Sequence, residues 1–526
     1  MMTYLELIFF LAAISWFLKQ VKNYLFWLYL WQLKNYHFGR FLAHFKTEAG
    51  KRIISGWLLF FAFFALASFL IFYPLSDYFY PAFLVFFCLV FVMEGLVFLK
   101  NLFTGKLKRP EFTKKIVFLG FFSLAVLLFF VFDVFNNSSE ASFFAIAYLF
   151  LLDLLAPLVV SFIVIVFQPL TIVLRNRIIK KAIRKREKLE NLLSIGITGS
   201  FGKSSVKEFL KNILSSDFKV AATEKNENSE MGVSEYILKS LNEEHEIFIC
   251  EMGAYNQGGI KLLCSIAKPK IGIITGINNQ HLATFGLQEN IVKAKFELID
   301  CLPEEGLAVL NWDSELVRRG FKKNISNLKY GILNKEDIWA EDIKVEKNKL
   351  SFRACFKNKD SVRIEAGVAG EQNIPNLLAA IAVARKLGMD LKDIASSCRK
   401  IKDEDNIFSF KGIDVLNFSY SSNLSGVLAH LEHLKHWPGK KVVVMPCLIE
   451  LGRDSKIAHK EIGKKIAEVC DWAVIANKEC FRAIGGKAVF MNNPLKIYEK
   501  ITKELAPGDV VLLEGRVPEK LINLLK

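Results

Sequence analysis

The stretch that decides the fold of the second part of this chain is Leu192-Leu193-Ser194-Ile195-Gly196-Ile197-Thr198-Gly199-Ser200-Phe201-Gly202-Lys203-Ser204. Its first seven residues have the length and composition of a buried strand, and residues 205–214 have the pattern of an amphipathic helix. A strand, a glycine-rich loop and a helix in this order predict a phosphate-binding loop. The glycines let backbone N–H groups close around phosphate oxygens, and the helix dipole adds positive potential.

The residue types of this loop predict individual roles in binding ATP and Mg²⁺. Lys203 would neutralise the β- and γ-phosphates, and the Ser204 hydroxyl would hold Mg²⁺. The common pattern has a glycine at the position of Ile197, which here is flanked by glycines at 196 and 199. Because the Gly-Lys-Ser triplet follows a strand and opens a helix, we still predict a nucleotide site. The other predicted nucleotide contacts from this loop are Gly199, Ser200, Gly202 and Ser205.

Two later apolar strands end in polar residues that can converge on the loop. Residues 247–253 contain a buried strand that ends in an acid, Glu251, and residues 271–275 lead to a polar run that ends at His281. Short strands alternating with amphipathic helices predict a parallel α/β sheet, and ligands bind at the carboxyl ends of such strands. Each residue alone is typical of a surface or core position. Together, after a phosphate loop, they predict a metal site.

The first 170 residues are strongly apolar and predict a multi-span α-helical membrane region. A helix needs about 20 residues to cross a bilayer. The first candidate is short and carries Glu6, and the stretch 24–32 is too short to span alone, which favours an interfacial position. Loops 74–78 and 135–142 lack Lys and Arg, so the charge bias predicts five spans, with the N-terminus outside and the C-terminus in the cytoplasm. The candidate spans are 4–18, 56–73, 79–99, 116–134 and 143–167.

Residues 171–190 form a basic juxtamembrane segment. Such a segment attracts anionic headgroups at about 1 kcal/mol per basic residue, and a solvated helix obeying the positive-inside rule gives the same composition. The formal net charge of +16 is concentrated in this segment and in loops, so membrane topology explains it better than a nucleic-acid partner. Its basic residues are Arg175, Arg177, Lys180, Lys181, Arg184, Lys185, Arg186 and Lys188.

Asp153 lies well inside the last predicted span, and Glu94 lies near the end of the third. A carboxylate in hydrocarbon is costly, so it faces a partner or a wet cavity. Asp153 is therefore either a candidate for substrate contact or a member of a structural hydrogen bond inside the bundle.

The nine cysteines are scattered, and no two form a Cys-x-x-Cys pair. This spacing indicates neither a zinc knuckle nor a disulfide scaffold, and it predicts a reducing, cytosolic setting for the part after the spans.

The motifs of residues 192–526 resemble the Mur ligase family, which joins an amino acid or peptide to a carboxylate using ATP. Within the family they are most similar to the D-alanyl-D-alanine-adding branch of peptidoglycan synthesis. Hydropathy and charge predict a transmembrane region 1–170 and the basic segment 171–190, and the resemblance implies an ATP-binding P-loop central domain 191–403 and a Rossmann-like α/β C-terminal domain 404–526. The stretches that carry it are 197–205, Glu251-Met252-Gly253-Ala254, 275–282, Ala294-Lys295-Phe296-Glu297, 372–380, and Ile449-Glu450-Leu451-Gly452 with His459.

The resemblance also implies roles for single residues. Lys203, Lys295 and His281 would be catalytic, with Ser204, Glu251, His281 and Lys295 forming the metal site. Lys295 matches the lysine that is carbamylated in many members, where the added carboxylate helps to bind metal. Asn376 would contact adenine. The implied reaction converts a carboxylate into an acyl phosphate, which an amine then attacks.

Several positions depart from the family pattern. The predicted spans stand where members usually have a soluble domain that recognises UDP, so the substrate is predicted to be lipid-linked or bound without a nucleotide handle. Residues 417–424 lack both acids of the family motif, the usual arginine near Phe408 is missing, Glu514-Gly515-Arg516 replaces Lys-Gly-Ser, and Pro446-Cys447 replaces Gly-Asp. In the family these positions help to close the C-terminal domain on ATP or to hold the incoming amine. Because they differ here, the sequence does not identify the amine acceptor.

Three functions remain open at this point. The leading one is an ATP-dependent amide ligase at the inner face of the bacterial cytoplasmic membrane, using a muropeptide-like or other carboxylate, an amino-acid or dipeptide amine, and contacts with membrane lipids. A membrane-anchored polyglutamate synthase would share the ATP-binding core. A scaffold that binds nucleotide without catalysis would explain the altered C-terminal motifs.

Overall fold

The computed structural model describes residues 4–34, 36, 38–45, 50–51, 53, 76–104, 107–137, 143–224, 227–254, 256–278, 285–402, 406–419, 423–448, 451 and 455–526. The chain separates into two compact units, residues 1–174 and 175–526. The division falls inside the predicted basic segment. Each unit is described by itself.

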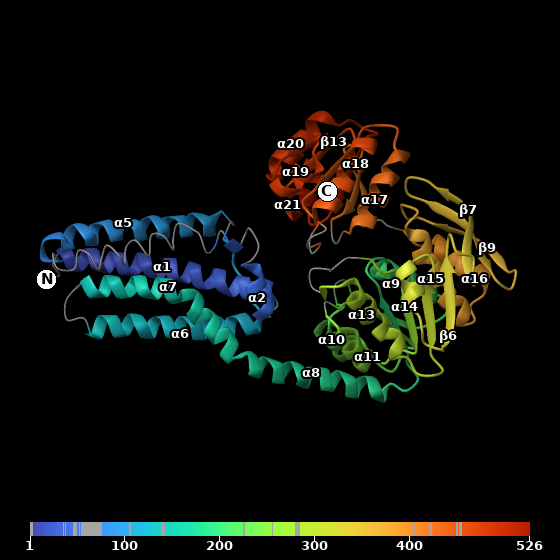
Figure 1. Cartoon of the computed structure of the whole chain (residues 1–526), viewed down its shortest axis with the longest axis horizontal. Coiled ribbons are helices and arrows are strands. Elements are labelled where there is room, and N and C mark those ends of the chain that lie inside the picture. Colours follow the sequence, from blue (N-terminus) through green and yellow to red (C-terminus); the bar gives the residue numbers. More distant parts are fainter. Residues whose placement is uncertain are drawn as a thin grey trace. The chain divides into compact units, whose positions relative to one another are not determined.

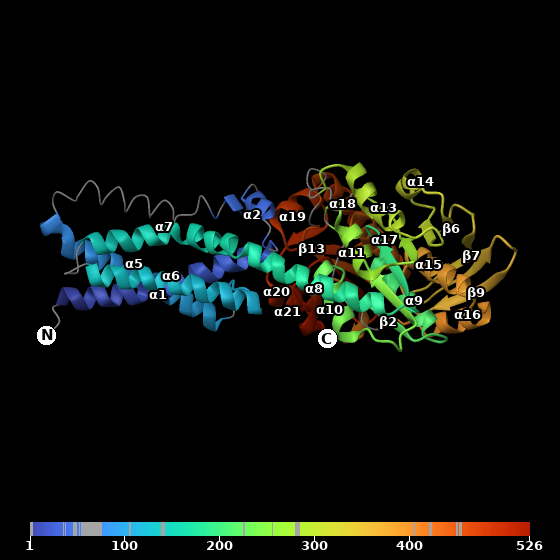
Figure 2. The same cartoon turned by 90° about the horizontal axis from the view of Figure 1, so that it is seen from below.

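The first unit is a bundle of long helices, which run alongside one another in both views (Figures 1 and 2). Buried Trp16, Leu28 and Trp31 pack with residues of α6 and α7 in its interior. Large apolar side chains also face outward, among them Phe121, which is 67% exposed, and Phe162, which is 68% exposed. Extensive exposed apolar surface marks an interaction site, such as a lipid-facing one. The helices are α1 (Tyr4–Leu33), α2 (Phe38–His44), α5 (Ser76–Phe103), α6 (Lys114–Asn137) and α7 (Phe143–Val166).

Two stretches among the described residues are long and apolar enough to cross a membrane, Lys114–Phe132 and Leu151–Lys188. They overlap the predicted spans 116–134 and 143–167. The predicted span 56–73 lies outside the described residues. An N-terminal helical region is therefore established, and its five-span topology stays a prediction.

The candidate span 4–18 and the apolar stretch 24–32, which the sequence suggests as separate segments, belong to the single helix α1. Lys19 and Gln20 are buried and contact the Asp153 carboxylate, and Asn23 Nδ2 donates to Asp153 Oδ1 at 3.2 Å. Of the two interpretations of Asp153, this geometry supports the structural one. The polar residues between the two apolar stretches, such as Lys19 and Asn23, pair with Asp153, which is about 130 residues away in the sequence. They therefore lie within the helix and do not mark its end.

The basic segment forms most of α8 (Gln168–Lys188), and one of its members does not face solvent or lipid. Arg186 is buried, and its guanidinium donates to Leu189 O at 2.8 Å, to Leu192 O at 2.7 Å and to Ser194 Oγ at 3.0 Å. It thereby joins the end of α8 to the start of the next strand. Arg186 therefore fits neither of the two alternatives for this segment, attraction to headgroups or a solvated helix face.

The middle of the chain folds around a nine-stranded sheet in the order β2-β3-β1-β4-β5-β6-β7-β8-β9. The strands from β2 to β7 are parallel, and β8 and β9 add an antiparallel edge. This confirms the predicted α/β fold. The strands are β1 (Leu193–Thr198), β2 (Val220–Ala222), β3 (Ile247–Glu251), β4 (Ile271–Ile274), β5 (Leu307–Asn311), β6 (Ser326–Gly331), β7 (Ile338–Val345), β8 (Leu350–Phe356) and β9 (Ser361–Ala366).

Helices cover both faces of this sheet, and the alternation along β1 explains its sequence. Ile195 and Ile197 pack in the core with α9 and α15. Gly196 faces the other layer, where an added Cβ would lie 2.8 Å from Leu298 of α13, so only glycine fits without a shift. The helices are α9 (Lys203–Leu214), α10 (Glu230–Ser240), α11 (Gly259–Ala267), α13 (Gln288–Asp300), α14 (Glu315–Gly320), α15 (Asn373–Lys386) and α16 (Leu391–Arg399).

The C-terminal domain has a six-stranded sheet in the order β10-β11-β15-β12-β13-β14, parallel except for the β10–β11 hairpin. Its strands are β10 (Ile407–Phe410), β11 (Ile413–Phe418), β12 (Lys441–Met445), β13 (Trp472–Ile475), β14 (Ala488–Phe490) and β15 (Val510–Glu514). Its helices are α17 (Leu424–His433), η2 (Leu434–His436), α18 (Ser455–Val469), α19 (Lys478–Ile484), α20 (Pro494–Glu504) and α21 (Glu519–Leu525).

The expectation of no disulfide is wrong for one pair. Cys447, which follows β12, is bonded to Cys480 of α19, and their Cα atoms lie 5.8 Å apart. The partners are 33 residues apart in sequence, so no local spacing signals them. The other described cysteines are free: Cys250, Cys264, Cys301, Cys355, Cys398 and Cys470.

Candidate functional site

The glycine-rich loop joins β1 to α9 and is held against the segment after β4. Ser200 N donates to Gly276 O at 2.7 Å, and the Thr275 hydroxyl donates to Phe201 O. Gly202 has φ +77°, and a Cβ there would lie 2.4 Å from the Asn376 side-chain oxygen. Any larger residue would therefore be strained and would displace Asn376.

The start of α9 presents unpaired backbone donors to this loop. Gly202 is the N-cap residue and provides no side-chain cap, so the first N–H groups of the helix have no acceptor within it. Lys203 opens the helix, and its Nζ donates to Gly199 O at 3.0 Å. Burial lowers the pKa of Lys203, and the nearby Glu251 carboxylate opposes that shift. This arrangement suits an anion such as a phosphate.

Ser204, in the first turn of α9, meets Glu251, the last residue of β3. Ser204 Oγ donates to Glu251 Oε2 at 2.8 Å, and Asn228 Nδ2 donates to Glu251 Oε1 at 3.0 Å. Glu251 is buried, and Lys207 Nζ lies 3.9 Å from its Oε2 atom. A hydroxyl and a buried carboxylate side by side are hard oxygen ligands of the kind that Mg²⁺ prefers, so the donor set fits this cation.

Lys295 lies in α13 and is almost fully buried, with 2% of its surface exposed. Burial, together with the positive charge of Lys203, lowers its pKa to about 7, while the carboxylates of Glu297 and Glu251 act in the opposite direction. Lys295 is thus within electrostatic reach of the loop. At neutral pH about half of its amine is uncharged, compared with about one part in 3,000 for an ordinary lysine.

Two further predicted site residues, Asn376 and Ser205, lie beside the glycine loop or in the helix that follows it. Asn376 packs against Gly202, and its Nδ2 donates to Gln372 O and Asn373 Oδ1, so its side chain supports the loop from α15. Ser205 lies in the first turn of α9. His281 lies outside the described residues, as does Glu450 of the C-terminal motif. The adenine and second-metal roles therefore stay predictions.

The sequence assigns no role to three residues that shape the site. Lys207 is fully buried and donates to Thr223 O at 2.6 Å beside Glu251. Lys207 lies four residues after Lys203, so both side chains lie on one face of α9. This spacing could have predicted that Lys207 lies near the phosphate loop. Glu297 accepts from Gly258 N at 2.5 Å and from Lys261 N at 2.9 Å, so it caps α11. Asn228, the partner of Glu251, has no comparable local signal.

In the C-terminal sheet, the carboxyl end of strand β15 carries a buried acid that is paired within the domain. Glu514, at the end of β15, is fully buried and lies 2.7 Å from His430 Nδ1. The His430 ring stacks on Phe418 with 3.9 Å between centroids. The carboxylate is therefore engaged within the domain, at the position where the family resemblance implies a lysine.

Comparisons with known proteins give consistent results for both domains. Two family models match the chain, one described as "Mur ligase middle domain" over residues 197–384 and one as "Mur ligase, glutamate ligase domain" over residues 406–517. Among curated proteins, the UDP-N-acetylmuramoyl-tripeptide–D-alanyl-D-alanine ligase of a Synechocystis species is 33% identical over 278 residues. That match covers 52% of this chain and 59% of the relative, so the chain spans less than two thirds of the relative's length.

Solved structures extend the similarity to the fold. MurF from Acinetobacter baumannii has a TM-score of 0.62 at 25% identity, covering 67% of this chain and 80% of that one. MurF ligase from Thermotoga maritima, solved in complex with ADP, has a TM-score of 0.60 at 27% identity, covering 66% of this chain and 83% of that one.

Proposed function

The chain belongs to the Mur ligase family, and from this membership we propose that it is an ATP-dependent amide ligase of peptidoglycan-precursor synthesis. The observation that carries the proposal is the meeting of Lys203, Ser204 and Glu251 at one sheet edge, with Ser204 and Glu251 2.8 Å apart and Lys295 in electrostatic reach. The names of the curated relatives support a muropeptide acid and a D-alanyl-D-alanine amine as the substrate class.

In the proposed reaction the glycine loop and the start of α9 bind the ATP phosphates through backbone N–H groups. The Lys203 ammonium offsets the negative charge that develops as the γ-phosphate passes to the acyl carboxylate, forming an acyl phosphate that the amine attacks. Ser204 and Glu251, with His281 and carbamylated Lys295, would hold Mg²⁺, which supplies positive charge beside the phosphates.

We further propose that the ligase acts at the inner face of the bacterial cytoplasmic membrane, as a multi-pass protein, on a lipid-linked acyl substrate. The outward apolar side chains of the N-terminal bundle and the two span-length stretches support this location. The helical region precedes β1 directly through α8, and its apolar surface suits a substrate with a lipid tail.

The test is a turnover assay on the full chain in detergent, comparing UDP-linked with lipid-linked muropeptides and adding D-alanyl-D-alanine or single amino acids. We expect phosphate release that rises at least about ten-fold when acid and amine are both present, and amide product seen by mass spectrometry. Preference for the UDP-linked acid would contradict the lipid-linked substrate. Nucleotide binding without turnover would instead favour a regulatory scaffold, the alternative that the buried Glu514–His430 pair supports.

The pKa of Lys295 gives a prediction about carbon dioxide. A carbamate forms on the neutral amine, and with a pKa of about 7 the neutral share rises from about a tenth at pH 6 to about nine tenths at pH 8. With limiting bicarbonate, we expect ATP turnover to rise over this range and to increase on adding bicarbonate. Lys295→Ala should lose at least about 100-fold in kcat and recover part of it with acetate.

The matched control is Lys293→Ala, because Lys293 is an exposed residue of the same helix. It should keep normal turnover and the bicarbonate response. Turnover of the unmodified protein that is independent of bicarbonate, with no rescue of Lys295→Ala, would rule out a carbamate.

A further inference from the structure

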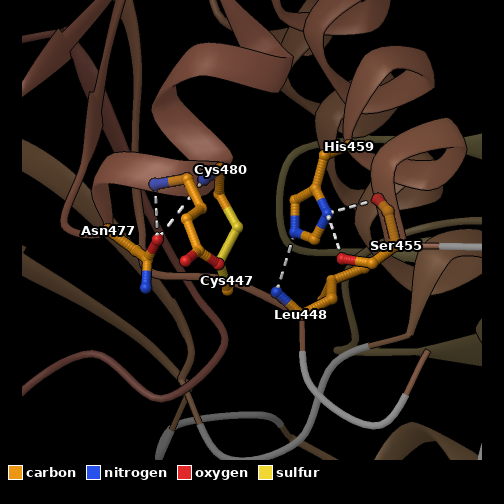
Figure 3. Close-up of a disulfide and its surroundings, with 7 residues drawn as sticks. Cys447, Leu448, Ser455, His459, Asn477 and Cys480 are labelled. Carbon is orange, nitrogen blue, oxygen red and sulfur yellow. Dashed lines mark hydrogen bonds between the residues drawn. A yellow bond between two sulfur atoms is a disulfide. The ribbon is translucent and has the colours of Figure 1, made fainter. Parts of the chain in front are cut away.

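Three side chains that can bind metal converge in the C-terminal domain, outside the ATP site. Cys447 follows β12, His459 lies in α18 and Cys480 lies in α19. Their two sulfur atoms and an imidazole nitrogen all lie within 4.8 Å of one another. His459 and Cys480 are buried and Cys447 is half-buried. Figure 3 shows the three side chains reaching one small space from different elements.

The hydrogen bonds of His459 hold its ring in the orientation that is typical of a metal-binding histidine. Nδ1 lies 2.6 Å from the Ser455 carbonyl oxygen, which can only accept, so this nitrogen carries the proton. Nε2 accepts from Leu448 N at 3.1 Å, so it is the unprotonated nitrogen, and a cation bound there would take the place of this hydrogen bond. Metal-binding histidines commonly donate their other ring N–H to a backbone carbonyl, as His459 does (Figure 3).

The chemistry of these donors selects the class of metal. Two thiolates and a neutral imidazole suit zinc and other thiophilic divalent ions, whereas Mg²⁺ prefers oxygen ligands. The other described cysteines are free, including Cys470, which is buried in the same domain. Free thiols are typical of a reducing compartment, where a close cysteine pair more often binds metal or is reactive than forms a lasting disulfide.

We propose that Cys447, Cys480 and His459 bind one thiophilic divalent cation of the zinc class when the cysteines are reduced. The Cys447–Cys480 disulfide is then the oxidised, metal-free form of the same site. Hydrogen peroxide would complete the conversion: two thiolates, one H₂O₂ and two protons give one disulfide and two waters. The two sulfur ligands are lost in this step, so the cation is released. Three protein ligands leave the fourth tetrahedral position to water.

The direct test is a zinc titration of the full chain, purified metal-free in detergent with a phosphine reductant, against a chromophoric chelator. We expect one zinc per chain. Cys447→Ser, Cys480→Ser and His459→Gln should each weaken binding by more than about 100-fold, which exceeds the loss expected for an outer-shell partner. Cys470→Ser is the matched control and should bind zinc normally, because Cys470 is a buried cysteine of the same domain outside the cluster.

A second measurement needs no variant and so survives any folding defect. Cobalt added to the reduced, unmodified protein should give the intense visible bands of a tetrahedral site and a sulfur-to-cobalt charge-transfer band. Titration with peroxide should remove two thiols per chain and release one zinc in step. The proposal is overturned if reduced protein binds no stoichiometric zinc, if the cobalt spectrum lacks the sulfur band, or if Cys447→Ser and Cys470→Ser bind alike.

Discussion

Replacing Lys203 with alanine is expected to abolish measurable ATP turnover, a fall in kcat of at least about 10²–10³-fold. The ammonium group lies at the start of α9, where backbone N–H groups already favour an anion. The Lys203 ammonium can stay in contact with the γ-phosphate while this group is transferred. Its one described hydrogen bond, to Gly199 O, contributes about 1 kcal/mol, so the domain should stay folded.

The measurement is steady-state phosphate release by the purified full chain, with a thermal melt to show that the fold is kept. Lys211→Ala is the matched control, because Lys211 is an exposed lysine on the last turn of the same helix. It should retain normal turnover. If Lys203→Ala turns over ATP at the normal rate, the assignment of the phosphate site is wrong.

The second large effect is expected for Glu251→Gln, which keeps the shape of the side chain and removes its charge. The carboxylate accepts hydrogen bonds from Ser204 and Asn228 and faces buried Lys207. We expect the Mg²⁺ concentration for half-maximal turnover to rise at least about ten-fold and kcat to fall about 100-fold. Buried Lys207 loses one acidic neighbour and keeps Glu208, whose Oε1 lies 3.4 Å from its Nζ, so the free energy of unfolding should also drop, by about 1–3 kcal/mol.

A Mg²⁺ titration of ATP turnover separates the two consequences, since lost stability alone does not change the half-saturating concentration. Glu243→Gln serves as the control, because Glu243 is an exposed acid of the same domain. An unchanged Mg²⁺ requirement in Glu251→Gln would show that this carboxylate is not a metal ligand.

The nucleotide half of the site was readable from the sequence because its signals are local. One strand, three glycines and a Lys-Ser pair lie within a dozen residues, and the structure places β1 at Leu193–Thr198 and α9 at Lys203–Leu214. Glu251 was found for a related reason, since it ends a strand that pairs in parallel with β1.

The errors share a physical cause, which is that the partner is distant in sequence. The first candidate span ends at residue 18, just before Lys19, because the acid that pairs with Lys19 is 134 residues away. Arg186 was one basic residue in a run of eight, and composition does not distinguish a buried guanidinium from an exposed one. Cys447 and Cys480 approach only when α19 returns to the end of β12. Local patterns carry no information about such pairings.

The Lys19–Asp153 pair has a consequence for how the N-terminal bundle is assembled. If the bundle sits in a bilayer as proposed, α7 carries a carboxylate that lipid does not tolerate alone. Its neutralising cation is made first, on α1, and must stay available until α7 has been synthesised. The first and last helices of the bundle are thus committed to one another during biogenesis, and neither is a free-standing anchor. A deletion of α1 would remove more than one hydrophobic segment, because it would leave α7 without the charge that lets it enter the membrane.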